Sequence, residues 1–214
     1  MDVVLMTDPR VTAIPVAENG EALVDVREAG LRTSSYRADD QGEFARVRSG
    51  LAERLLAAER ALPAGLRLLI IEGYRPLALQ ERYFGNYLGW LRREHPGRAD
   101  GELRGLASRH VSPPDIAPHS AGAAVDLALC TDDGEALDFG TPVNATPEES
   151  GGACYTEHPG LDGAARENRS ILGAALGGAG LVNYPTEWWH WSYGDRYWAM
   201  ATATPAAIYG PYQT

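Results

Sequence analysis

The chain of 214 residues contains no lysine, and arginine supplies all 19 of its basic side chains against 29 acidic ones. The formal net charge is −10. Such a surface repels phosphate backbones and anionic lipid headgroups. We therefore expect neither nucleic acid nor a membrane to be a partner of this protein.

Cysteine is scarce as well, since Cys130 and Cys154 are too few and too unpatterned to form a disulfide framework. We interpret both as small buried hydrophobic side chains. No apolar run reaches the length of a transmembrane helix. The first ten residues lack the basic region and apolar core of a secretion signal. These absences predict a cytoplasmic protein, and the length fits one domain, residues 1–214.

Hydrophobic periodicity and turn signals predict a mixture of strands and helices. The predicted strands are residues 11–16, 23–26, 66–71, 124–130, 181–193 and 196–201. The predicted helices are residues 40–62, opened by a capping box, 76–95, 101–108 and 164–176. Residues 131–163 are rich in glycine, proline and acids, and we expect them to form a long loop that faces the substrate.

Two of the five histidines, His119 and His190, stand among small or aromatic residues, where an imidazole needs a hydrogen bond or a metal. Asp126 interrupts an apolar strand, and a carboxylate there is costly unless it is paired or binds a metal. We predict that Gly122 lets the chain turn so that His119 and Asp126 meet. Satisfied core histidines and an arginine salt bridge are the alternatives. The histidines without a partner pattern are His95, His110 and His158.

Glu187 and His190 are three residues apart in an aromatic sequence, Glu-Trp-Trp-His. In a strand an odd separation directs two side chains to opposite faces, unless the chain enters the strand irregularly. Pro185 favours such an irregular entry. We expect His190 to bind a metal and Glu187 to act as a base on a neighbouring water, with a surface acid as the alternative.

A hydrolytic site also needs a fixed cation or donor beside the reacting carbonyl. Arg75 follows a predicted buried strand in Glu72-Gly-Tyr-Arg-Pro76, where glycine and proline force a turn. A guanidinium keeps its charge in a dry pocket. We therefore predict that Arg75 stabilises the oxyanion that forms during hydrolysis.

Three motifs, in this order, resemble the zinc D-alanyl-D-alanine dipeptidases of the VanX type, within the zinc D,D-peptidases. They are Glu72-Gly-Tyr-Arg-Pro76, His119-x-x-Gly-x-Ala-x-Asp126 and Glu187-Trp-Trp-His190. The resemblance implies one Zn²⁺ per chain held by His119, Asp126 and His190, with Glu187 as general base and acid and Arg75 at the transition state. It also implies an α+β fold of the hedgehog/DD-peptidase-like type, with a central antiparallel sheet flanked by helices.

Three positions depart from the pattern of that family. Ala117 stands where the family commonly has serine, Asn144 where it has aspartate, and Glu28 where it has an aromatic residue. In the family these residues serve the free ammonium group of the substrate, so we expect a rebuilt amino-terminal subsite beside intact metal machinery. Tyr74 is a further expected substrate-binding residue. The acids considered as replacements for the missing charge are Glu28, Glu148 and Glu149.

The sequence thus predicts a zinc metallopeptidase that hydrolyses D-alanyl-D-alanine, with a role in cell-wall formation or breakdown. A zinc D,D- or L,D-carboxypeptidase, or a dipeptidase for another small peptide, is the first alternative. A zinc protein that senses or sequesters a peptide is the second, and the presence of Glu187 argues against it, because binding alone needs no base. The expected partner is a small dipeptide, and the sequence leaves open whether the protein forms a homo-oligomer.

Overall fold

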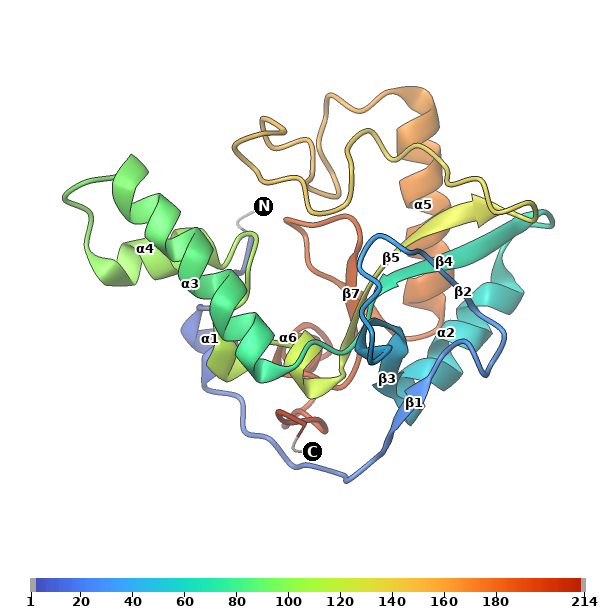
Figure 1. Ribbon diagram of the computed structural model, residues 1–214, viewed down its shortest axis with the longest axis horizontal. Helices are drawn as coiled ribbons and strands as arrows, with labels where there is room; N and C mark the ends of the chain where they lie inside the picture. Colours follow the sequence, from blue (N-terminus) through green and yellow to red (C-terminus); the bar gives the residue numbers. More distant parts are fainter. Residues whose placement is uncertain (1–2, 213–214) are drawn as a thin grey trace.

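A five-stranded sheet stands between helices in the computed structural model, which describes residues 3–212 (Figure 1). Met1 and Asp2 of the N-terminal segment discussed above lie outside the described residues. The strand order is β2 (Arg32–Thr33), β4 (Leu66–Glu72), β5 (Ala124–Thr131), β7 (His190–Ser192) and β6 (Val182–Asn183). Neighbouring strands are antiparallel except β2 and β4, which run parallel. The predicted α+β class with a central sheet flanked by helices is confirmed, and the sheet, predicted to be antiparallel, is mixed because β2 and β4 run parallel.

The helices lie in two groups on either side of the molecule (Figure 1). Near the sheet, α2 (Ser49–Ala61) packs against α5 (Gly163–Gly178), and a two-stranded sheet of β1 (Leu23–Asp25) and β3 (Arg46–Arg48) lies beside α2. On the other side α3 (Leu77–Glu94) packs against α4 (Asp100–Ala107), and α1 (Pro9–Thr12) against α6 (Arg196–Ala201). Short 3₁₀ turns are η1 (Glu43–Ala45), η2 (Pro114–Ile116) and η3 (His119–Ala121).

The two faces of strand β5 are covered by different parts of the chain. Leu127 and Leu129 pair with Ile70 and Leu68 of β4 and join the main core with apolar residues of α2 and α5. The opposite face, which carries Asp126 and Ala128, is covered in part by the long loop that follows β5. Because both faces are covered, β5 is a nearly continuous apolar run. Asp126 therefore lies on the loop side of the sheet.

Two segments predicted to be strands differ in the structure: residues 196–201 form a helix, whereas of residues 11–16 only Val11 and Thr12 belong to one. Residues 11–16 were expected to be extended, but Asp8 accepts a hydrogen bond from the Arg10 amide and Pro9 occupies the first position of α1. Residues 196–201 form α6, because the carboxylate of Asp195 accepts hydrogen bonds from the amides of Tyr197 and Trp198. In both cases a capping acid outweighs the apolar composition of the segment.

The predicted helix 40–62 begins only at Ser49. The carboxylate of Asp39 accepts hydrogen bonds from the amides of Gln41, Glu43 and Phe44 and closes a local turn, after which residues 46–48 form β3. The predicted aromatic strand 181–193 is likewise interrupted, since β6 and β7 are separated by a turn.

Other predictions are confirmed. Helices occupy 77–94, 100–107 and 163–178, strands occupy 66–72 and 124–131, and an irregular segment joins β5 to α5. Both cysteines are buried free thiols. In the described part of the chain, no helix combines the length and apolarity that crossing a membrane requires.

Candidate active site

Strand pairing and a short turn bring the three predicted metal ligands together. Asp126 on β5 lies directly opposite His190 on β7, and η3 presents His119 to the same end of the sheet. Oδ1 of Asp126 lies 3.1 Å from Nδ1 of His190 and 3.3 Å from Nε2 of His119. The two imidazole nitrogens are 3.1 Å apart. All three side chains are buried.

The turn between His119 and Asp126 depends on Gly122, as predicted. Its φ of 65° lies in the left-handed region that favours glycine. A side chain at this position would also overlap Cδ2 of Leu23 on β1. The glycine therefore lets η3 end tightly enough for β5 to begin beside His119.

The donor set fits a zinc ion. The Nδ1–H of His119 donates to the carbonyl oxygen of Gly73 at 2.7 Å, which leaves the Nε2 lone pair facing Asp126. Burial lowers the pKa of His190, which favours a neutral imidazole. Burial also opposes ionisation of Asp126, yet the two imidazoles hold the pKa of this carboxyl well below its usual range. Tetrahedral zinc with bonds of roughly 2.0–2.2 Å needs ligand atoms roughly 3.3–3.6 Å apart, close to the separations observed.

Glu187 reaches the same cavity through the irregular entry to β7. The Glu187 amide donates to the carbonyl of Tyr184, and the His190 amide donates to the carbonyl of Glu187. This turn places Oε2 of Glu187 3.7 Å from Nδ1 of His190. Burial raises the pKa of Glu187 well above its ordinary value, and the neighbouring Asp126 adds to the effect. A carboxyl group with a raised pKa is suited to accept and return a proton.

Arg75 is held rigidly at the end of β4. Its Nε and Nη2 donate to the two carboxylate oxygens of Glu72, each at 2.7 Å, and its Nη1 donates to Oε1 of Gln80 at 2.8 Å. The guanidinium holds the pKa of Glu72 below its usual range despite burial. Arg75 lines the same small cavity as His119, Asp126 and Glu187. Glu72 and Gln80 were not predicted as site residues, although both lie within five positions of Arg75.

His110 is a site residue that the sequence interpretation missed. Its Nδ1 lies 3.7 Å from Oε1 of Glu187, and its ring packs edge-on against Tyr87 with centroids 5.1 Å apart. Burial lowers the pKa of His110 to about 4, so the ring is neutral at pH 7. The sequence shows no partner pattern for His110, and the structure places its ring beside Glu187 and Tyr87.

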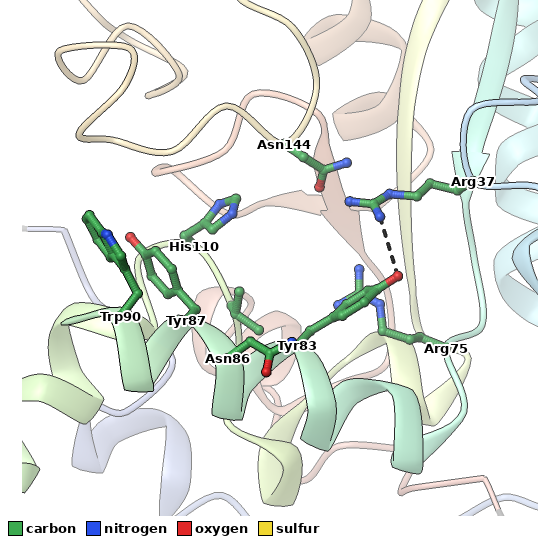
Figure 2. A pocket seen from close by; sticks show the side chains of 9 residues that line it. Arg37, Arg75, Tyr83, Asn86, Tyr87, Trp90, His110 and Asn144 are labelled. Carbon is green, nitrogen blue, oxygen red and sulfur yellow. Dashed lines mark hydrogen bonds between the residues drawn. The ribbon is translucent and has the colours of Figure 1, made fainter. Parts of the chain in front are cut away.

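A wider pocket of about 350 Å³ opens beside the small cavity (Figure 2). Arg75, His110 and Asn144 line both spaces. Asn144 comes from the long loop, which supports the prediction that this loop faces the site, and its φ of 65° is uncommon outside glycine. Ala117 lines the small cavity.

The structure does not bring Glu28 and Tyr74 to these cavities. Glu28 is exposed on the turn after β1. Tyr74 precedes Arg75 in an extended segment, where neighbouring side chains point to opposite sides, and its ring meets that of Tyr212 instead. Of the two loop acids, Glu148 accepts a hydrogen bond from the Tyr87 hydroxyl at the rim of the wide pocket. Glu149 is exposed and bonds within its own loop to Thr146.

Comparison with known proteins agrees with this site. The model of the peptidase M15 family of D-ala-D-ala dipeptidases matches residues 37–206. A D-alanyl-D-alanine dipeptidase of Synechocystis is 28% identical over an alignment that covers 87% of each chain. One of Escherichia coli is 39% identical over 72 residues, 34% of this chain and 35% of that one. Among solved structures, the LD-carboxypeptidase LdcB is 18% identical with a TM-score of 0.47, covering 87% of this chain and 73% of that chain.

The family match includes His119, Asp126, Glu187 and His190 and extends over most of the sequence. It therefore covers strands β4, β5, β6 and β7, the turn at η3 and the long loop. This protein belongs to the family of D-ala-D-ala dipeptidases.

Proposed function

We propose that this protein hydrolyses D-alanyl-D-alanine with one zinc ion held by His119, Asp126 and His190. The observation that carries the proposal is the separation of the three ligand atoms, 3.1 to 3.3 Å, with Glu187 beside them. Two imidazoles and one carboxylate leave a fourth position open, which is typical of catalytic rather than structural zinc. When bound, zinc supplies Lewis-acid polarisation of the peptide carbonyl and lowers the pKa of the attacking water.

Glu187 handles the proton in this proposal. The carboxylate accepts a proton from the water that attacks the peptide carbonyl carbon. The same carboxyl group then donates that proton to the peptide nitrogen as the carbon–nitrogen bond breaks and D-alanine leaves. The raised pKa of Glu187 brings its proton affinity closer to those of the attacking water and the leaving peptide nitrogen. This suits a group that must first accept a proton and then donate it.

Arg75 stabilises the negative charge that develops on the carbonyl oxygen. Glu72 and Gln80 fix its guanidinium with three hydrogen bonds, so the donor needs no reorganisation during the reaction. Arg75 and Glu187 line the same small cavity, which is consistent with action on one peptide bond.

The test is the release of D-alanine from D-alanyl-D-alanine by zinc-loaded protein. We expect Glu187→Gln, which keeps the shape of the side chain, to lower kcat by roughly 10²–10⁴-fold. Elemental analysis should still find one zinc per chain in this variant. Turnover retained by Glu187→Gln would refute the role of that residue, and no turnover by the loaded wild type would refute the function.

A carboxypeptidase is the second candidate, and the wide pocket favours it. This pocket of about 350 Å³ adjoins a metal-side cavity of only about 20 Å³, which leaves room for a peptide longer than two residues. A panel of D,D-, L,D- and N-acylated dipeptides separates the two functions. Hydrolysis of the free D,D-dipeptide alone supports the dipeptidase, whereas faster cleavage of N-acylated peptides supports the carboxypeptidase.

A cytoplasmic location and a role in cell-wall formation or breakdown belong to the same proposal. D-Alanyl-D-alanine is a cell-wall building block, so its hydrolysis acts on that material. Cell fractionation with an antibody against the protein tests the location, and recovery outside the cytoplasmic fraction would contradict it.

A further inference from the structure

The wide pocket of Figure 2 has donors and cations on its wall. Arg37, Arg75, Tyr83, His110 and Asn144 all line it, and among the described residues no aspartate or glutamate does. A cavity of this composition attracts an anion and repels an ammonium group. The pocket therefore differs in sign from the acidic surface of the whole chain, whose net charge is −10.

Two guanidinium groups in this pocket share one carboxylate. Nε and Nη2 of Arg75 each donate a hydrogen bond of 2.7 Å to one carboxylate oxygen of Glu72. Nε of Arg37, in contrast, is 3.8 Å from Oε2 of the same residue. Nε of Arg37 is buried and has no hydrogen-bond partner in residues 3–212. Nη1 of Arg37 makes one long hydrogen bond, 3.4 Å, to the hydroxyl of Tyr83. The guanidinium of Arg37 therefore has no carboxylate within hydrogen-bond distance in residues 3–212.

Asn144 adds an unused donor to the same space. Its Nδ2 is buried without a hydrogen-bond partner in the described structure, and its backbone is left-handed. A buried unsatisfied donor and a left-handed backbone are both costly, and such costs are typical of residues that await a ligand. In Figure 2 the amide of Asn144 and the guanidinium of Arg37 both point into the pocket.

The acid nearest to the pocket on the long loop does not cancel this charge. Glu148 lies at the rim, where its carboxylate accepts hydrogen bonds from Arg109 and from the hydroxyl of Tyr87. Its charge is thus already paired with a third guanidinium. Glu148 therefore does not engage the unpartnered donors of Arg37 and Asn144.

We propose that this pocket is a carboxylate-binding subsite, in which Arg37 and Asn144 hold a carboxylate of the peptide substrate. The inference rests on the proposed peptidase function and adds which group the peptide must carry. Two sources share this chemistry: the C-terminal carboxylate of the dipeptide, and an acidic group attached on its amino side. A guanidinium and an amide donor together suit the two oxygens of either group.

Four peptides separate the two sources. D-Alanyl-D-alanine and its C-terminal amide differ in the C-terminal carboxylate, whereas N-succinyl- and N-acetyl-D-alanyl-D-alanine differ in an acid on the amino side. Binding is measured by calorimetry on zinc-loaded Glu187→Gln protein, with and without Arg37→Gln, and kcat and KM are measured with Glu187 intact. Arg93→Gln is the control, because it removes an equal charge from an exposed position on α3 that does not line the pocket.

In one of the two pairs, we expect the peptide with the carboxylate to bind roughly ten- to a hundredfold more tightly than its partner. Arg37→Gln should abolish that preference, and Arg93→Gln should keep it. Asn144→Asp, which tolerates the left-handed backbone and adds a negative charge, should abolish it independently of any effect of Arg37 on folding. The pair that responds identifies the source.

The proposal is overturned if neither pair shows a preference, or if Arg37→Gln weakens both members of a pair by the same factor. A different set of results would refute the proposed peptidase function. A wild type that hydrolyses none of the four peptides, while Glu187→Gln protein still prefers the carboxylate through Arg37, would refute the peptidase and keep the subsite.

Discussion

The imidazole of His110 faces the carboxyl group of Glu187, with Nδ1 3.7 Å from Oε1. This nitrogen is buried and has no hydrogen-bond partner in the part of the chain that the structure describes. The separation is too long for a hydrogen bond, so a small shift of either side chain on substrate binding would complete one. His110 is thereby placed to orient the proposed base.

We predict that His110→Phe lowers kcat about tenfold with little change in KM, because phenylalanine keeps the packing on Tyr87 and removes the donor. Steady-state kinetics on D-alanyl-D-alanine measures this split. His110→Asn, which retains a donor, should recover part of the rate. If the phenylalanine variant has the wild-type kcat, His110 serves only to fill space.

The same residue predicts a pH dependence of folding stability. The pKa of His110 is lowered by burial from 6.5 to about 4. Between these values the unfolded chain binds the proton and the folded chain does not, so the free energy of unfolding falls as the pH is lowered. From pH 8 to pH 5 this loss is about 2 kcal/mol. Denaturant unfolding of metal-free wild type and His110→Phe at both pH values should show a smaller loss for the variant, and equal losses would contradict the assignment.

Metal removal gives a third prediction. Asp126 is buried between two imidazoles, and without a cation this carboxylate loses its strongest partner. We expect a chelator to lower the melting temperature of the wild type, and zinc to restore it. His119→Ala should hold no zinc and show no response to the chelator. His95→Ala, at the C-terminal end of α3 and outside both cavities, should behave as the wild type. A melting temperature of the wild type that ignores both additions would contradict the metal site.

Gly122 provides a fourth prediction. Alanine there must adopt a left-handed φ of 65° and displace Leu23, so Gly122→Ala should lower the free energy of unfolding by about 2–4 kcal/mol. Gly101→Ala is the matched control, since this position is helical and a side chain meets nothing within 4 Å. It should be neutral or stabilise by about 0.5–1 kcal/mol. Chemical denaturation measures both, and equal effects would show that the turn is not constrained.

The candidate metal ligands could be selected from the sequence because each is a polar residue in surroundings where such a side chain is costly without a partner. Asp126 is a carboxylate in an apolar strand, and His119 follows a constrained proline-rich segment. Apolar periodicity likewise predicted strands β4 and β5 and helices α3 and α5. The strand predictions for residues 11–16 and 196–201 were wrong because they rested on apolar composition and gave no weight to the capping acids Asp8 and Asp195, which start α1 and α6.

His110 and Arg37 could not be found in this way. Both stand in irregular segments, where periodicity gives no direction for a side chain, and each meets its partners only through the packing of distant parts of the chain. Arg37 reaches Tyr83 on α3, 46 positions away, and His110 reaches Glu187 at the entry to β7. Such contacts depend on the placement of α3 and the long loop, which local sequence does not specify.

Asp126 and His190 lie opposite each other only when β5 and β7 pair in the observed register. In β-strands a shift of one residue turns every side chain to the other face. A slip between β5 and β7 would therefore separate the two ligands while the two strands remained paired. Only the correctly aligned sheet assembles the metal site, so metal occupancy would reveal misaligned molecules that measurements of secondary structure content would overlook.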